Sequence, residues 1–210
     1  DPRDLTAAGI TAVAGPAETD GLPPVAVMMN TAGVNAWDPF GSVVRATPLT
    51  GLDDVSLLVL YAAHVMTSIG SYGPISPSDH CNYGDPGQAW RMAFPLYFAR
   101  AVAHAHPGVV NGPGTLALGP ISAIETPSCG GVTSPGARLV PFVAGALFDL
   151  IDDSPGELFD DLCTPGPSHD TTIMQIVDRE LDLGWFNPDL QRFTDAWIAR
   201  GRDLRRPHLH

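Results

Sequence analysis

The sequence predicts a mainly α-helical protein of the α+β class, with a small β-sheet near its N-terminus. Two long apolar stretches, Leu57 to Ile69 and Gly87 to His106, lack the alternation of a strand, whereas β-branched runs occur early in the chain. A chain of 210 residues that is 44% hydrophobic can build one real core. We therefore expect a single domain over 1–210, with a β or irregular part over 1–50, a helical core over 51–201 and a tail over 202–210.

The strands are expected between residues 24 and 48. An apolar run from Val25 to Met29 follows two prolines, and a second β-branched patch extends from Ser42 to Ala46. The segment between them is rich in turn-forming residues, which predicts a small strand pair.

The first helix is expected over 54–69. Asp53 and Asp54 suit a helix start, where free N–H groups favour negative charge, and Gly70 suits its end. His64 is the one strongly polar group in the middle of this apolar run. A lone histidine on a buried helix is usually a hydrogen-bonded core residue, so this reading is favoured over a ligand.

The second helix is expected from Gln88 to His106. Pro95 lies inside it and predicts a kink or a broken start, because proline removes a helical hydrogen bond. His104 and His106 fall on different sides of the helix end, so a polar end is favoured over a metal site.

Three further helices follow. The ranges expected are Ala137 to Ile151, Thr171 to Asp182 with Ser168 or Asp170 near its N-cap, and Pro188 to Arg200 with Gly201 closing it.

Acidic residues crowd the segment after the third helix. Asp152 and Asp153 begin this cluster, which could hold Ca²⁺ but lacks the spacing of an EF-hand. A solvated acidic loop is the favoured reading, and calcium near Asp152 and Asp153 is the alternative.

Charge and cysteine usage limit the partners and the compartment. The net charge of −12 disfavours nucleic acid, because binding phosphates requires clustered cations. No apolar run is long enough to span a bilayer. Cys81, Cys129 and Cys163 lack zinc-knuckle spacing; one disulfide and one free thiol would suit export, although the odd number weakens that inference. The sequence leaves their pairing and the oligomeric state open.

Five segments, in the same order, resemble exported bacterial zincin-like proteins of the gluzincin metallopeptidase type. They are LYAAHVM (60–66), GQAWRMAFPLYFA (87–99), ETPSCG (125–130), VAGALFDLIDD (143–153) and RFTDAWIARG (192–201). The resemblance covers about residues 55–201 and implies a zincin-like helical core in a secreted or cell-envelope protein.

The departures from this family concern its chemistry. HExxH places two histidines one turn apart on a zinc ion, with a glutamate as the general base. By position, Leu60 replaces the first histidine, Tyr61 replaces the glutamate, and Met92 replaces the glutamate ligand of the second helix, while His64 alone survives. One histidine does not supply the three protein ligands of a catalytic zinc. We therefore expect no catalytic residues and no metal, with His64 as the candidate ligand if zinc binds.

Three readings follow. The preferred reading is a catalytically inactive zincin-like protein with a binding or structural role, for which a protein or peptide partner is suitable. The alternative is an active hydrolase with a metal site rearranged around His64. The third is an unrelated helical domain, for which the similarity reflects ordinary helix composition.

Overall fold

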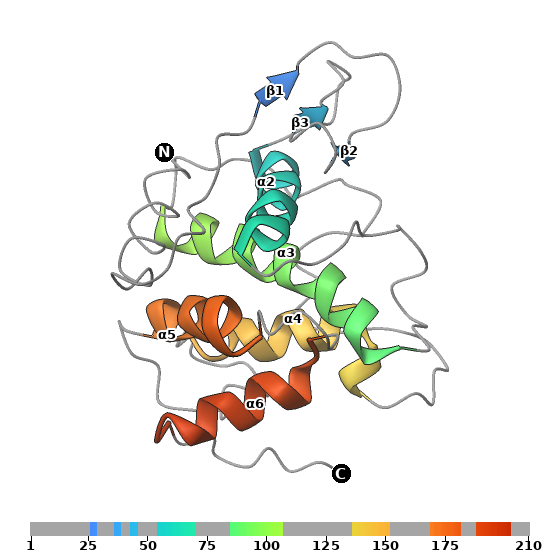
Figure 1. Cartoon of the computed structure of the whole chain (residues 1–210). Coiled ribbons are helices and arrows are strands. Elements are labelled where there is room, and N and C mark those ends of the chain that lie inside the picture. The colour runs from blue at the N-terminus through green and yellow to red at the C-terminus, as the bar shows by residue number, and fades with distance from the viewer. Residues whose placement is uncertain are drawn as a thin grey trace.

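The computed structural model is mostly helical. It describes residues 26–28, 36–38, 43–45, 54–69, 85–106, 136–151, 169–181 and 188–202. Figure 1 shows the strands at one end of the molecule beside α2, with α3 crossing the middle and α4, α5 and α6 on the other side of α3.

Three short strands lie in the region where a strand pair was expected. They are β1 (Ala26–Met28), β2 (Ala36–Asp38) and β3 (Val43–Arg45), in the spatial order β1-β3-β2. β1 runs parallel to β3 and β2 runs antiparallel to it, so Val44 is paired on both sides. The side chain of Val44, the middle residue of β3, is fully buried, so the face of the sheet that carries it points toward the interior.

Helix α2 (Asp54–Ile69) confirms the range expected from its acidic start and apolar run. Its stability comes from the burial of its apolar residues, because Val55, Val59 and Val65 are only moderate helix formers. Near its end, the Thr67 hydroxyl donates to the Ala63 carbonyl oxygen at 2.7 Å, which satisfies a side chain within the helix itself.

Helix α3 (Pro86–Ala105) is the central element of the fold. The Asp85 carboxylate caps it by accepting a hydrogen bond from the Gly87 N–H at 2.9 Å, and Pro86 occupies the first turn, where it loses no hydrogen bond. The helix therefore starts two residues before the expected Gln88. It also continues through Pro95, so of the two expectations for this proline the broken start is wrong.

The third predicted helix is shorter than expected. A 3₁₀ turn, η2 (Gly136–Arg138), precedes α4 (Val140–Phe148), and a turn follows it. Pro141 explains the late start, because proline fits the first turn of a helix and breaks its interior.

The fourth helix changes type along its length. It begins as α5 (His169–Gln175) and continues as a π-helical segment, η3 (Ile176–Glu180). It therefore starts before the expected Thr171, and Asp170 lies in its first turn, near the cap as expected, while Ser168 lies outside the described residues.

Helix α6 (Leu190–Ala199) has well-defined ends. The Asp189 carboxylate accepts from the Arg192 N–H at 2.9 Å, so Pro188 precedes the cap instead of opening the helix. At the other end Gly201 has φ of 71°, and the N–H groups of Gly201 and Arg202 donate to the carbonyls of Ile198 and Trp197. This pattern is a Schellman motif, and it confirms Gly201 as the stop signal.

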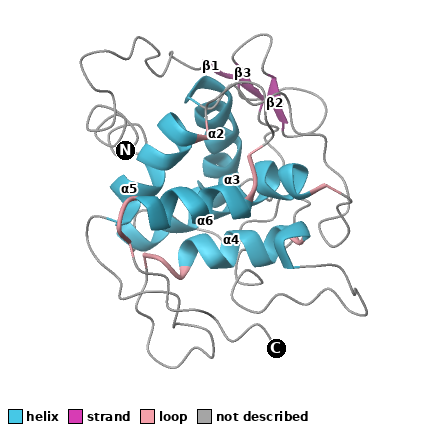
Figure 2. Ribbon diagram, turned by 60° about the horizontal axis from the view of Figure 1, so that its bottom comes forward, coloured by secondary structure: helices cyan, strands magenta, loops and turns pink. Residues whose placement is uncertain are grey.

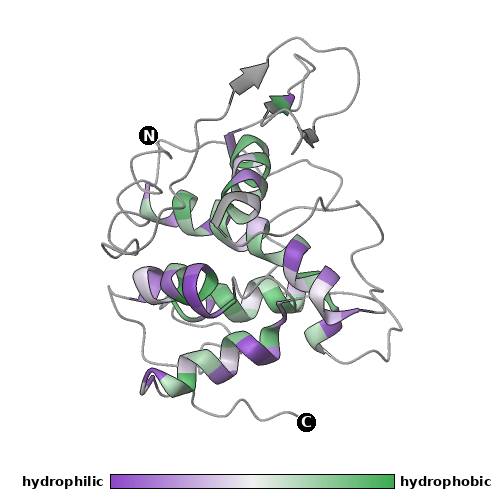
Figure 3. Cartoon of the chain, viewed as in Figure 1, coloured by the Kyte–Doolittle hydropathy of each residue, from purple (hydrophilic) through white to green (hydrophobic). Residues whose placement is uncertain are grey.

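The core is one contiguous cluster formed by α2, α3, α4, α5, η3 and α6. Trp90, Phe94, Phe148 and Trp197 are its largest buried aromatic side chains. Figure 2 shows these helices packed around α3, and Figure 3 shows that α2 is apolar around most of its circumference, whereas polar and apolar residues alternate along α6. The fold therefore positions every described helix by its contact with α3 or with a neighbour of α3.

Candidate functional site

The positions aligned with the zinc ligands of a gluzincin are buried. Leu60 is 8% exposed and Met92 is 4% exposed, while His64 is fully buried. Tyr61, at the position of the general base, is half-buried and packs against the core. These side chains therefore occupy interior positions and contain no carboxylate.

The structure does not bring Leu60 into the cluster that holds Met92. The α2 residues that belong to this cluster share one side of the helix: Val55, Leu58, Val59, Ala62, Val65 and Met66. Leu60 and His64 are four residues apart, so both lie on the opposite side. In an HExxH site this face would have to meet the second helix, so the observed face of α2 departs from that arrangement.

The Tyr61 ring contacts both the His64 ring on α2 and the Phe98 ring on α3. Its ring lies 6.0 Å from the His64 ring and 6.4 Å from the Phe98 ring, measured between centroids. Tilted aromatic pairs at this separation contribute packing energy beyond their buried area. At the position where a peptidase would keep its base, this chain therefore has an aromatic packing contact.

No group of three or more histidine, cysteine, aspartate or glutamate side chains suited to a metal occurs among the described residues. The calcium alternative cannot be placed, because Asp152 and Asp153 lie outside the described residues. Cys81, Cys129 and Cys163 also lie outside them, as does the segment 125–130 of the resemblance.

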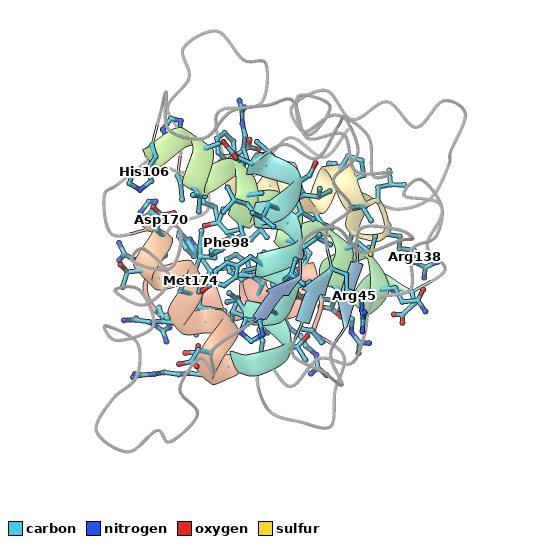
Figure 4. The ribbon with its side chains drawn as sticks, turned by 90° about the horizontal axis from the view of Figure 1, so that it is seen from above. Arg45, Phe98, His106, Arg138, Asp170 and Met174 are labelled. Atoms are coloured by element: carbon cyan, nitrogen blue, oxygen red, sulfur yellow. The ribbon has the colours of Figure 1, made fainter. Side chains whose placement is uncertain are left out.

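A second group of polar side chains lies where Tyr97 of α3 meets Asp170 of α5. The Tyr97 hydroxyl donates a hydrogen bond to an Asp170 carboxylate oxygen at 3.3 Å. Tyr97 is only 2% exposed, whereas Asp170 is exposed as a residue but has its carboxyl group partly desolvated beside Tyr97. Figure 4 shows Asp170 at the edge of the molecule near His106, while Phe98 and Met174 lie further in.

Two histidines flank this pair. His169 is buried, and its Nδ1 lies 2.6 Å from the Leu150 carbonyl oxygen, while its ring meets the Trp197 ring edge-on at 5.2 Å. His104 is exposed on α3 and meets the Phe148 ring edge-on at 5.8 Å. Because a carbonyl only accepts hydrogen bonds, Nδ1 of His169 is the donor.

Burial dominates the titration of the pair. Desolvation raises the pKa of Tyr97 well above its usual value, and the negative charge of Asp170 and the hydrogen bond to it raise it further. Desolvation also raises the pKa of Asp170, although the hydrogen bond from Tyr97 and the nearby His104 and His169 act in the opposite direction. Perturbed groups that gather in one place indicate a functional or regulatory role more often than isolated ones do.

Sequence reasoning did not find this second group. Tyr97 and Asp170 are 73 residues apart. Asp170 was expected near a helix cap, and Tyr97 lies inside the range expected for the second helix. The sequence offered one indirect indication of this contact: a tyrosine in an apolar helix, such as Tyr97, usually needs a hydrogen-bond partner for its hydroxyl.

The comparisons with known proteins add no relative: no family model, no curated protein and no solved structure matches the chain. Of the described helices, none combines the length and the apolar character that crossing a membrane requires.

Proposed function

We propose that this chain is a zincin-like protein without peptidase activity, with a binding or structural role. The observation that carries the lack of peptidase activity is the burial of Leu60, His64 and Met92 in positions without carboxylates. The face of α2 that carries Leu60 and His64 turns away from Met92, which favours the third reading, an unrelated helical domain, over the zincin-like part of the proposal. A catalytic zinc needs three protein ligands directed at one point and an open position for water. Met92 lies in the core and Leu60 lies on the opposite side of α2, so these side chains supply neither the converging ligands nor the open position.

The loss of such a site is compatible with a stable fold. Replacing buried charged groups by well-packed apolar side chains is often neutral or stabilising, because the desolvation of the charges no longer has to be offset. Tyr61, packed between His64 and Phe98, is the replacement of this kind for the general base.

The binding role is proposed toward a protein or peptide. The net charge of −12 repels phosphate backbones and favours basic partners, which are steered toward an acidic surface at low ionic strength. A secreted or cell-envelope location follows from the resemblance, and fractionation of the native host with an antibody against the chain tests it. Recovery in the cytosol alone would contradict export.

A peptidase assay tests the inactive state directly. The purified chain is incubated with a mixed peptide library, with and without added zinc and with and without a chelator, and cleavage is followed by mass spectrometry. We expect no chelator-sensitive cleavage.

The matched variants are His64→Ala and His106→Ala, which remove a histidine from the candidate position and from the end of α3. Chelator-sensitive cleavage that is lost in His64→Ala and retained in His106→Ala would establish the alternative, a hydrolase with its metal site around His64.

A further inference from the structure

The helix that begins as α5 ends in a π-helical turn, η3, and α6 lies beside this helix in Figures 1 and 2. At the end of the turn, the Leu181 N–H donates to the Ile176 carbonyl oxygen at 3.0 Å, five residues back, where an α-helix would use Val177. Turns of this kind are rare and occur frequently at functional sites. A contact that selects the wider turn would therefore link the conformation of η3 to its neighbour.

The guanidinium group of Arg200, at the end of α6, reaches both ends of this turn. Its Nε and Nη2 donate to Oε1 of Glu180 at 2.9 and 2.6 Å, and its Nη1 donates to Oε1 of Gln175 at 2.6 Å. In an α-helix, two residues with this spacing of five lie about 140° apart around the axis. In a π-helix, the i→i+5 hydrogen bonds close the turn, so the two residues lie nearly one above the other. The rigid fork of one arginine therefore matches the π form of the turn.

Burial of the helix does not by itself select the wider turn. Ile173, Val177 and Leu181 are all buried, and an α-helix also places residues with this spacing of four on one face. An α form of the segment would therefore keep these three side chains on one side of the helix. It would separate Gln175 from Glu180 around the axis, so the contacts of Arg200 are the ones that distinguish the two forms.

Arg200 is itself held in place by the end of α6. Its backbone N–H donates to two carbonyls of the last turn at 3.2 Å, and the Schellman motif at Gly201 ends the helix directly after it. On the other side of Gly201, Arg202 donates to the Thr172 hydroxyl of α5 at 3.0 Å. The end of α6 is therefore attached to the neighbouring helix by two arginines, and of these two Arg200 spans the π turn.

We propose that Arg200 is a latch that holds residues 176–180 in the π form, and that opening the latch returns this turn to the α form. The side chains of Arg200 and Glu180 are 25% and 36% exposed, so dissolved ions reach and screen their ion pair. Opening the latch releases the end of α6 and changes the hydrogen-bond register of the turn in the same step. The device is separate from the positions aligned with a zinc site.

Nuclear magnetic resonance of the isotope-labelled full chain tests the proposal. Scalar coupling across the hydrogen bond identifies the carbonyl that accepts from the Leu181 N–H, which is Ile176 in the π form and Val177 in the α form. Hydrogen exchange of the same N–H reports how often the turn opens. In Arg200→Lys the charge is kept and the fork is lost, so we expect the acceptor to change to Val177 and the exchange rate of Leu181 to rise several-fold.

The matched control is Arg202→Lys, which makes the same change two residues along, at the contact with Thr172. It should keep Ile176 as the acceptor and leave the exchange rate of Leu181 unchanged. Gln175→Ala provides a second variant, because it keeps the ion pair of Arg200 but removes one end of the span, and it should change the acceptor in part of the molecules.

Two results would overturn the proposal. One is that Leu181 keeps Ile176 as its acceptor, at an unchanged exchange rate, in Arg200→Lys or in Gln175→Ala, because packing alone would then select the π form. The other is an equal change of acceptor in Arg202→Lys, because the effect would then not depend on the span of Arg200.

Discussion

The two faces of α3 differ in how they are held. Toward α2, the contact consists of aliphatic and aromatic side chains, with Phe98 meeting the ring of Tyr61. Toward α5, the contact includes a buried phenol that donates to a carboxylate, with two histidines beside it. The first contact therefore rests on packing, whereas the second includes a buried hydroxyl group that keeps a hydrogen-bond partner.

The segments that suggested a zincin-like protein and the hydrogen-bonded pair Tyr97 and Asp170 therefore involve different faces of α3. The resemblance predicted from the sequence concerns α2 and α3, where Leu60, His64 and Met92 are buried. Tyr97 and Asp170, which interact with one another, lie on α3 and α5 and are not among the positions Leu60, Tyr61, His64 and Met92.

The largest effect is expected from Phe94→Ala. Phe94 is fully buried, and its ring lies between those of Trp90 and Tyr97, at centroid distances of 6.3 and 5.8 Å. Removing a buried phenylalanine leaves a cavity and should lower the free energy of unfolding by about 3–5 kcal/mol. Urea denaturation measures it, with Met92→Leu as the volume-conserving control at less than about 1.5 kcal/mol. A loss as small as that of the control would show that the aromatic core is not packed as described.

Met92→Glu tests whether the aligned ligand position is truly apolar. A carboxylate introduced at this buried position lacks a positive partner among the described cluster residues, and an uncompensated buried charge costs about 3 kcal/mol. Burial would raise the pKa of the new carboxyl, so the folded state would bind its proton more tightly than the unfolded state. Stability should therefore recover as the pH falls below neutrality. Unfolding curves that match those of the unmodified chain at neutral pH would instead indicate an open, hydrated position.

Tyr97→Phe probes the polar face. The hydrogen bond to Asp170 is long, at 3.3 Å, and its removal should cost about 1 kcal/mol near neutral pH. Because the pKa of Tyr97 is raised in the folded state, the unfolded chain loses this proton first, and stability should fall as the pH rises above about 10. The variant should lose that part of the alkaline decrease. If its decrease between pH 9 and 11 equals that of the unmodified chain, Tyr97 is not the buried phenol described here.

The smallest effect is expected from Asp170→Asn at neutral pH, and its sign is the informative part. The raised pKa of Asp170 means that the folded state binds the proton more tightly than the unfolded state. The stabilisation is present at low pH and is lost as the pH rises through the folded pKa, so the ionised carboxylate is a net cost at neutral pH. The variant should be as stable as the unmodified chain or slightly more stable at pH 7. A clear loss in thermal denaturation would mean that the charge of Asp170 stabilises the fold.

Local signals made several helices predictable. The apolar run with acids before it gave the range of α2, and Gly201 gave the end of α6. The misplaced ends have identifiable causes: Asp85 and Pro86 form a stronger start for α3 than Gln88, and Pro141 delays α4. These cues were present in the sequence and depend on residue-level capping chemistry.

The junction of Tyr97 with Asp170 could not be predicted in the same way. The contact joins residues from two helices far apart in the chain, and it depends on how α5 packs on α3. The face of α2 that turns toward the core was equally hidden, because the run from Leu57 to Met66 is apolar nearly all round. Packing therefore decided the placement of Leu60 and His64, and the sequence pattern did not.

Zinc titration calorimetry of the purified chain, after treatment with a chelator, tests the central claim most directly. With apolar side chains at Leu60 and Met92 and a single buried histidine at position 64, we predict no saturable heat at one zinc per chain and the same trace for His64→Ala. Binding of one zinc ion per chain that disappears in His64→Ala would contradict the account.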